Sequence, residues 1–275
     1  MTKLAGKVAI ISGSGRGIGR ALALKLASDG ARLVVNDLDE EQASAVVSEI
    51  RAAGGEAVSV VGDVTAADFA DRFVEAALSN FGGLDIIVNN AGYTRDGVIQ
   101  RHTDQQFQSM LDVHVVAPFR ILRAAAEPIR TFHKREAAEG REHARKVVNI
   151  SSMAGTHGNA GQVSYSSAKS ALVGMTKTLS KEWGRYKVCV NCVAFGFIDT
   201  RLTKPMDDPA SRIEIAGEAI QAGVPAAALN ALSAMVPLGR AGTPEEAAGG
   251  VYLFCIPESD YVSGQVLIVG GGISI

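Results

Sequence analysis

Short apolar runs alternate along the chain with longer segments whose apolar and polar residues recur at helical spacing. The runs are KVAIIS, ARLVVN, EAVSVV, DIIVNN, KVVNIS, VCVNCV and QVLIVG, separated by segments such as GRALALKLASDG and EEQASAVVSEIRAAGG. This alternation is typical of a parallel sheet with helices on both faces. It predicts the α/β class, specifically a doubly wound Rossmann-type domain with about seven parallel strands.

Two segments interrupt the alternation. Residues 131–146 are densely charged with both signs, and we expect them to extend the preceding helix into solvent before a loop. Residues 201–243 lie between the sixth and seventh predicted strands and are rich in Ala, Pro and Gly. Long insertions often form lids or binding loops, so this segment is expected to cover the substrate. Neither segment resembles a linker, and we expect one domain over residues 1–275.

Composition narrows the function classes. The chain has 275 residues, of which 47% are hydrophobic and 20% charged, as in ordinary soluble globular proteins. A net charge of -2 provides no field that attracts nucleic acid or an anionic membrane. The N-terminal residues contain neither a signal-peptide core nor a membrane span. We therefore expect a cytoplasmic protein that acts on a small molecule.

The cysteines and histidines do not form a recognisable metal site. Cys189 and Cys192 are three residues apart on a predicted strand, so their side chains point to opposite faces. We expect them to be structural thiols rather than a redox pair or zinc ligands. The five histidines lack ligand spacing with carboxylates or thiols, and no catalytic metal is expected.

A glycine-rich turn follows the first predicted strand and leads into a helix. Glycines allow a sharp turn and a close approach to a pyrophosphate, which the free N–H groups and dipole of a helix N-terminus attract. After a strand in a βαβ pattern, such a turn predicts a dinucleotide site. The glycines follow a GxxxGxG pattern, and the expected cofactor contacts are Gly13, Ser14, Arg16, Gly17, Ile18 and Gly19.

An acidic residue ends the second predicted strand. Asp37 lies 20 residues after Gly17, where a carboxylate accepts hydrogen bonds from the adenosine ribose and repels the additional phosphate of NADP. NAD is therefore the expected cofactor, with NADP as the alternative. Arg16 favours NADP, but we give Asp37 more weight because two anions in a partly buried site repel each other. The competing interpretation of Asp37 is a plain N-cap for the next helix.

Tyr165 and Lys169 begin a strong helical pattern, and their spacing places the phenol and the ammonium on one face. A nearby cation stabilises a phenolate and lowers the pKa of tyrosine from its usual value of about 10. Ser152 follows the fifth predicted strand, at the edge where open α/β sheets bind ligands. These residues predict an acid/base, a cation that activates it and a hydroxyl that holds the substrate oxygen.

Taken in chain order, these motifs resemble the short-chain dehydrogenase/reductase family over essentially the whole chain. The 13 residues from Ser152 to Tyr165 match the family spacing. The matching motifs are the GxxxGxG loop, Asp63-Val64, Asn89-Asn90-Ala91-Gly92, Ser152, and Tyr165 to Lys169.

The resemblance implies a nicotinamide-dependent oxidoreductase in which Tyr165 exchanges a proton with the substrate. It implies that Lys169 also binds the nicotinamide ribose. Further cofactor contacts implied by the resemblance are Asp63 and Val64 at the adenine ring, and Asn90, Ala91 and Gly92 along the cofactor.

Two positions depart from the family pattern. His114 stands where the family usually has an asparagine that binds a water of the proton relay. A histidine also binds water, so His114 joins the catalytic set, and the alternative is a packed helix histidine. Phe195 replaces the proline of a Pro-Gly pair, which makes the turn less rigid. The backbone contacts to the carboxamide are expected from Gly196, Ile198 and Thr200.

The segments GTHGNAGQVSYSSAK, FGFIDTRLT and VPLGRAGTPEEAA are similar to those of 3-oxoacyl reductases. With His114, which resembles (3R)-hydroxyacyl-CoA dehydrogenases, they favour a 3-hydroxyacyl or 3-oxoacyl thioester as substrate. The alternative enzyme is an alicyclic alcohol or hydroxysteroid dehydrogenase. A nucleotide-binding regulatory protein without catalysis is the alternative from another class. The resemblance also implies a homotetramer formed through helices at 104–130 and 163–185 and through the C-terminal strand.

Overall fold

Seven parallel strands form the central sheet, in the order β3-β2-β1-β4-β5-β6-β9. The structure, a computed structural model, describes residues 2–208, 211–215 and 218–273. The predicted doubly wound sheet is confirmed, and each predicted apolar run contains one of its strands. They are β1 (Val8–Ile11), β2 (Arg32–Asp37), β3 (Ala57–Val61), β4 (Ile86–Asn89), β5 (Arg145–Ser152), β6 (Val188–Phe195) and β9 (Val266–Val269).

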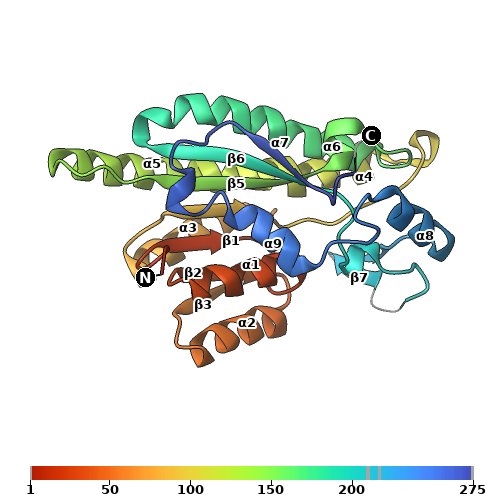
Figure 1. The fold of residues 1–275 in the computed structure, drawn as a ribbon, viewed down its shortest axis with the longest axis horizontal. Helices are drawn as coiled ribbons and strands as arrows, with labels where there is room; N and C mark the ends of the chain where they lie inside the picture. The colour runs from red at the N-terminus through yellow and green to blue at the C-terminus, as the bar shows by residue number, and fades with distance from the viewer. Residues whose placement is uncertain (1, 209–210, 216–217, 274–275) are drawn as a thin grey trace.

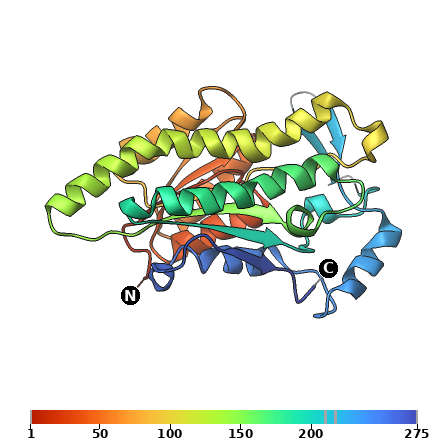
Figure 2. The same cartoon turned by 90° about the horizontal axis from the view of Figure 1, so that it is seen from above.

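Helices cover both faces of the sheet (Figures 1 and 2). One apolar core lies between the sheet and α1, α2 and α9, and the other lies between the sheet and α3, α4, α5 and α7. Because both faces are buried, the strands are rich in apolar residues, and most of their polar side chains are buried. The helices are α1 (Gly17–Ser28), α2 (Glu40–Ala52), α3 (Phe69–Phe81), α4 (Asp104–Leu111), α5 (Ala117–Ala138), α6 (Met153–His157), α7 (Val163–Glu182), α8 (Ala226–Met235) and α9 (Pro244–Tyr252).

The strand order reverses between β1 and β4. The chain winds outward from β1 to β3, then returns to pair β4 with the other side of β1. At such a switch point the loops leaving the two strands diverge to opposite faces and open a crevice at their carboxyl ends. The loops after β1, β4 and β5 therefore converge on one site.

The helix predicted over 104–130 is interrupted by one π-helical turn, η2 (Asp112–Val116), between α4 and α5. Single π-helical turns of this kind often occur at functional sites. The spacing of apolar residues alone does not reveal such a turn. His114 lies at the centre of this turn.

The charged segment 131–146 extends α5 to Ala138, as predicted, but it is not wholly solvated. Glu136 and Arg145 are buried and form two hydrogen bonds of 2.9 and 2.6 Å. The Arg145 guanidinium also donates to the Leu84 carbonyl, so the pair anchors the end of the long helix to the sheet. This anchor lies at the amino end of β5, and Ser152 lies at the opposite end of that strand.

The insertion 201–243 contains a two-stranded antiparallel ribbon, β7 (Arg212–Ile215) and β8 (Glu218–Gln221), in addition to α8. The sequence analysis did not predict this ribbon, because its two runs are short and carry several charges. Residues 209–210 and 216–217 of the insertion lie outside the described residues. Figure 1 shows β7 and α8 beside the carboxyl ends of the central strands. Throughout the described residues, no helix combines the length and apolar character needed to cross a membrane.

Candidate active site

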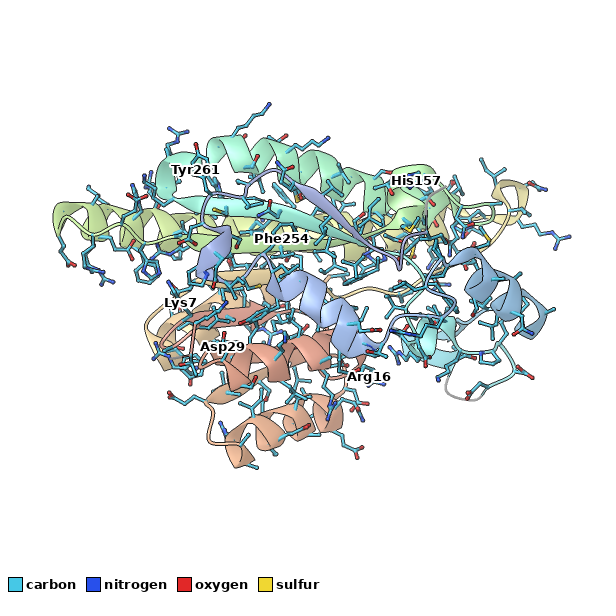
Figure 3. All side chains as sticks on the ribbon, viewed as in Figure 1. Lys7, Arg16, Asp29, His157, Phe254 and Tyr261 are labelled. Atoms are coloured by element: carbon cyan, nitrogen blue, oxygen red, sulfur yellow. The ribbon has the colours of Figure 1, made fainter. Side chains whose placement is uncertain are left out.

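A cavity of about 880 Å³ opens at the carboxyl ends of the strands. Figure 3 shows Arg16 and His157 toward this end of the molecule, with Lys7 and Asp29 at the other end. All the predicted site residues except Ser14 line the cavity. The strand ends thus gather into one space residues that are up to 187 positions apart, from Gly13 to Thr200.

Helix α1 begins at Gly17 inside the glycine turn, with no side-chain cap at its N-terminus. Gly13 and Gly17 adopt positive φ angles of 64° and 53°, which favour glycine. At Gly19 a Cβ atom would come within 2.2 Å of the Gly13 carbonyl oxygen, so a side chain there would open the turn. The turn therefore brings bare backbone and a helix N-terminus to the wall of the cavity, as an anionic pyrophosphate requires.

Ser14 differs from the expectation that it contacts the cofactor. Its side chain is fully buried beneath the turn rather than facing the cavity. The hydroxyl donates to the Ile11 carbonyl at 2.7 Å and accepts from the Asn36 N–H at 3.1 Å. These partners lie on β1 and β2, so Ser14 ties the turn to both strands.

Asn90 supports the turn from the other side. Its amide nitrogen donates to the carbonyls of Ser12 and Gly13 at 3.0 and 2.8 Å. The residue after β4 thereby fixes the loop after β1, which rigidifies the crevice between the two strands.

Asp37 lies at the carboxyl end of β2, and only 12% of its side chain is exposed. A Cβ atom on Gly15 would approach its Oδ2 to 2.7 Å, so the carboxylate packs directly against the glycine turn. The N-cap of α2 is Asp39, whose Oδ1 accepts from the Glu41 N–H at 3.0 Å. Asp37 is therefore not the cap, and its carboxylate faces the cavity. Arg16 pairs with Asp39 at 2.9 Å and lies 3.6 Å from Asp37.

Tyr165 and Ser152 lie together at the floor of the cavity. Helix α7 carries Tyr165 in its first turn, and Ser152 ends β5 as the N-cap of α6. Burial raises the pKa of Tyr165 to about 12, although the Ser152 hydroxyl lowers it and the charge of Asp96 raises it further. Tyr165 is thus a phenol at neutral pH, which is the form that donates a proton.

The pKa of Tyr165 is raised rather than lowered, in contrast to the expectation, because burial outweighs any stabilisation of the phenolate by Lys169. The Lys169 ammonium donates to the Ile150 carbonyl at 2.8 Å and lies 5.6 Å from the centre of the Tyr165 ring. Complete burial of Lys169 lowers its own pKa to about 8, partly offset by Cys192. A cation that is itself desolvated and held by a backbone carbonyl stabilises a neighbouring anion less than spacing on a helix suggests.

His114 is buried and its ring packs against Gly92, where a Cβ atom would come within 2.2 Å of His114 Cε1. Its Nε2 lies 2.8 Å from the Tyr93 carbonyl, so Nε2 must carry the hydrogen and Nδ1 is left as an acceptor. Burial and the charge of Lys169 lower the pKa of His114 well below its usual value, which keeps the ring neutral. Nδ1 is buried and has no hydrogen-bond partner within the described part of the chain.

The remaining predicted residues line the cavity from the ends of β3, β4 and β6. Asp63 and Val64 follow β3, and the Asp63 carboxylate accepts from the Thr65 N–H at 2.8 Å. Gly196 follows β6 and donates to the Val269 carbonyl at 3.0 Å, which holds the turn that lacks proline. The other lining residues of this set are Ala91, Gly92, Ile198 and Thr200.

The sequence analysis missed a polar group on the substrate side of the cavity. Gln162 precedes Tyr165 by three residues and donates to both oxygens of Asp96 at 3.0 Å. Asn159 in turn donates to the Gln162 side chain at 2.9 Å. The position of Gln162 just before Tyr165 was a usable signal, whereas its pairing with Asp96 depends on the fold.

Comparison with known proteins identifies the family. A sequence model described as short chain dehydrogenase matches residues 7–210. The chain belongs to the short-chain dehydrogenase family. It is 35% identical over 274 residues to a 3-oxoacyl-[acyl-carrier-protein] reductase of Synechocystis sp., covering 99% of this chain and 98% of that protein. It is 37% identical over 265 residues to the short-chain reductase protein NovJ of Streptomyces niveus, covering 96% and 93%. A similar reductase, FabG of Thermotoga maritima, is 33% identical over 273 residues, covering 99% and 100%.

Short-chain dehydrogenases use nicotinamide cofactors, and this cavity fits one. The close backbone approaches at Gly13 and Gly19 and the uncapped start of α1 suit a pyrophosphate. Asp37 and His114, whose buried Nδ1 has no hydrogen-bond partner among the described residues, both line this cavity. When bound, the nicotinamide supplies or accepts the hydride.

The cysteines of this dehydrogenase are buried free thiols, as predicted. Cys189 donates to the Asp260 carbonyl, whereas Cys192 lies near Lys169, and burial raises the pKa of Cys192 to about 11. In the part of the chain that the structure describes, no three His, Cys, Asp or Glu side chains group together as metal ligands.

Proposed function

We propose that this short-chain dehydrogenase interconverts a secondary alcohol and a ketone of an acyl thioester, as a 3-hydroxyacyl dehydrogenase or 3-oxoacyl reductase. The observation that carries the reaction is the grouping of Ser152, Tyr165 and Lys169 at the floor of the cavity, with the Lys169 ammonium 5.6 Å from the centre of the Tyr165 ring. The substrate class is supported by the relatives named 3-oxoacyl-[acyl-carrier-protein] reductase, which match nearly the full chain.

In the proposed mechanism Tyr165 donates a proton to the ketone oxygen during reduction and accepts it back during alcohol oxidation. The Ser152 hydroxyl hydrogen-bonds the same substrate oxygen and fixes its position beside the phenol. The Lys169 ammonium stabilises the tyrosinate that follows proton donation and holds the nicotinamide ribose. Because Tyr165 is a phenol at neutral pH, ketone reduction is the direction in which it begins in the correct form.

His114 is proposed to hold the water that returns a proton toward Lys169. Its Nδ1 accepts, its Nε2 is fixed by the Tyr93 carbonyl, and the charge of Lys169 acts on the ring. Replacing His114 with leucine is expected to lower kcat about 10²-fold, a typical contribution of acid–base catalysis. His114→Asn, whose amide also binds water, is expected to retain kcat within about tenfold. Equal losses in both variants, measured by steady-state kinetics, would contradict the relay.

NAD is the proposed cofactor. The Asp37 carboxylate is partly buried against the glycine turn, so a 2′-phosphate there would meet an anion. Asp37→Asn is expected to raise the ratio of kcat/KM for NADP to that for NAD about tenfold. The control Glu40→Gln makes the same charge change on an exposed neighbour and is expected to leave the ratio unchanged. A wild-type preference for NADP would overturn the assignment.

The substrate class is tested by steady-state oxidation of 3-hydroxybutyryl-CoA beside cyclohexanol and a hydroxysteroid, with NAD and NADP in parallel. Turnover of the thioester with NAD is expected. Rapid oxidation of a ring alcohol without thioester turnover would keep the reaction and replace the substrate, since the cavity also has room for a ring.

We further propose a cytoplasmic homotetramer in which residues 1–275 form one domain. Phe107 and Phe119 expose apolar surface on α4 and α5, and Ile268 does so on the edge strand β9. Three unpaired thiols suit a reducing compartment. Light scattering at micromolar concentration that gives the monomer mass would contradict the tetramer.

A further inference from the structure

Asp96 lines the same cavity as Tyr165. It lies in the loop after β4, and both of its oxygens are 3.0 Å from Gln162 Nε2. Gln162 is the N-cap of α7, the helix that carries Tyr165. The Gly97 N–H donates to the Gly161 carbonyl at 2.7 Å, so the loop and the start of α7 are joined by backbone as well. Asp96 therefore keeps a constant position relative to Tyr165.

The side chain of Asp96 is a carboxylate anion. One amide group donates to both of its oxygens, so both oxygens are acceptors, as in the ionised form. The pKa of Asp96 is raised by desolvation, which Gln162 and His102 offset only in part, and the charge of Asp96 in turn raises the pKa of Tyr165. The side-chain hydrogen bond of Asp96 is with the uncharged amide of Gln162, and the charge that lowers its pKa is that of His102. Its negative charge is thus felt where the substrate must lie.

We propose that Asp96 excludes substrates with a free carboxylate near the reacting ketone and so selects 3-oxo compounds whose carboxyl group is masked as a neutral thioester or ester. In a 3-oxo acid the carboxylate carbon is two bonds from the ketone carbon. When the ketone oxygen meets Tyr165, that carboxylate enters the field of Asp96, and like charges repel in a partly desolvated space. A thioester at the same carbon carries no charge and is not repelled. This inference rests on the function proposed above and names the feature that recognises its substrate class.

The test compares acetoacetate with methyl acetoacetate, which differ in this charge, by kcat/KM with NADH. Asp96→Asn is expected to raise the ratio of kcat/KM for acetoacetate to that for methyl acetoacetate about tenfold. Asparagine still accepts a hydrogen bond from Gln162, so the loop stays joined to α7. Asp96→Glu retains the charge and is expected to keep the wild-type ratio.

Asp112→Asn is the matched control, because Asp112 also lines the cavity but its side chain accepts from Gln108 and does not act on Tyr165. Its ratio is expected to stay at the wild-type value. An unchanged ratio in Asp96→Asn, or an equal rise in Asp112→Asn, would overturn the role of Asp96 and leave the proposed function intact.

A second pair, 2-oxocyclohexanecarboxylate and its methyl ester, separates the two proposals. If the enzyme reduces only the two cyclohexane compounds, the proposed acyl thioester substrate is wrong. The ratio of kcat/KM for 2-oxocyclohexanecarboxylate to that for its methyl ester then tests the role of Asp96. An enzyme that reduces neither ester overturns both proposals.

Discussion

Tyr165→Phe is expected to lower kcat about 10³-fold or more while leaving the dissociation constant for NADH within about twofold. The variant loses only the phenolic oxygen, which is the proposed proton donor. Because the ring remains, its edge contact with His114 and its packing in the first turn of α7 are retained. Steady-state kinetics with acetoacetyl-CoA and fluorescence titration with NADH measure the two quantities.

Tyr261→Phe is the control for this variant, since Tyr261 is fully exposed at the other end of the molecule. It is expected to match the wild type in both measurements. If Tyr165→Phe retained turnover, the protein would use another acid. A wild type that binds NADH but turns over no substrate would be the nucleotide-binding protein without catalysis that the sequence left open.

Lys169→Met is expected to lower kcat about 10²-fold to 10³-fold and to weaken NADH binding, so that both quantities change. Methionine fills a similar volume without the ammonium, so the tyrosinate loses its stabilising charge and the ribose loses a donor. The melting temperature is not expected to fall, because a buried cation whose pKa is lowered to about 8 is costly to the folded state.

Lys177→Met provides the comparison on the same helix, where the lysine is exposed. It is expected to leave kcat and NADH binding at wild-type values. A Lys169→Met enzyme that lost turnover but bound NADH normally would confine Lys169 to the proton chemistry and contradict its contact with the ribose.

The sheet and most of the site were predictable because they depend on short-range patterns. Strands buried on both faces are continuously apolar, and parallel strands place all their carboxyl ends at one edge. Asp37 and Ser152 end their strands and the glycine turn follows β1, so the common edge of the parallel strands brings them together.

The parts that were not predicted depend on geometry that spacing does not encode. Ser14 belongs to the same turn as Gly13, yet its hydroxyl points inward to β2. The contact between Asp96 and Gln162 joins residues 66 positions apart and exists only because two loops meet. The pKa of Lys169 reflects its burial, which a helical spacing of four residues does not reveal.

The most direct test of the account is the deuterium content of 3-hydroxybutyryl-CoA formed from acetoacetyl-CoA with NADH labelled at C4. The account predicts one deuterium at C3 of the product in the wild type and no product above background with Tyr165→Phe. Product that contains no deuterium, whichever face of the nicotinamide ring carries the label, would contradict the proposal. NADH binding without reduction of any ketone would also contradict it.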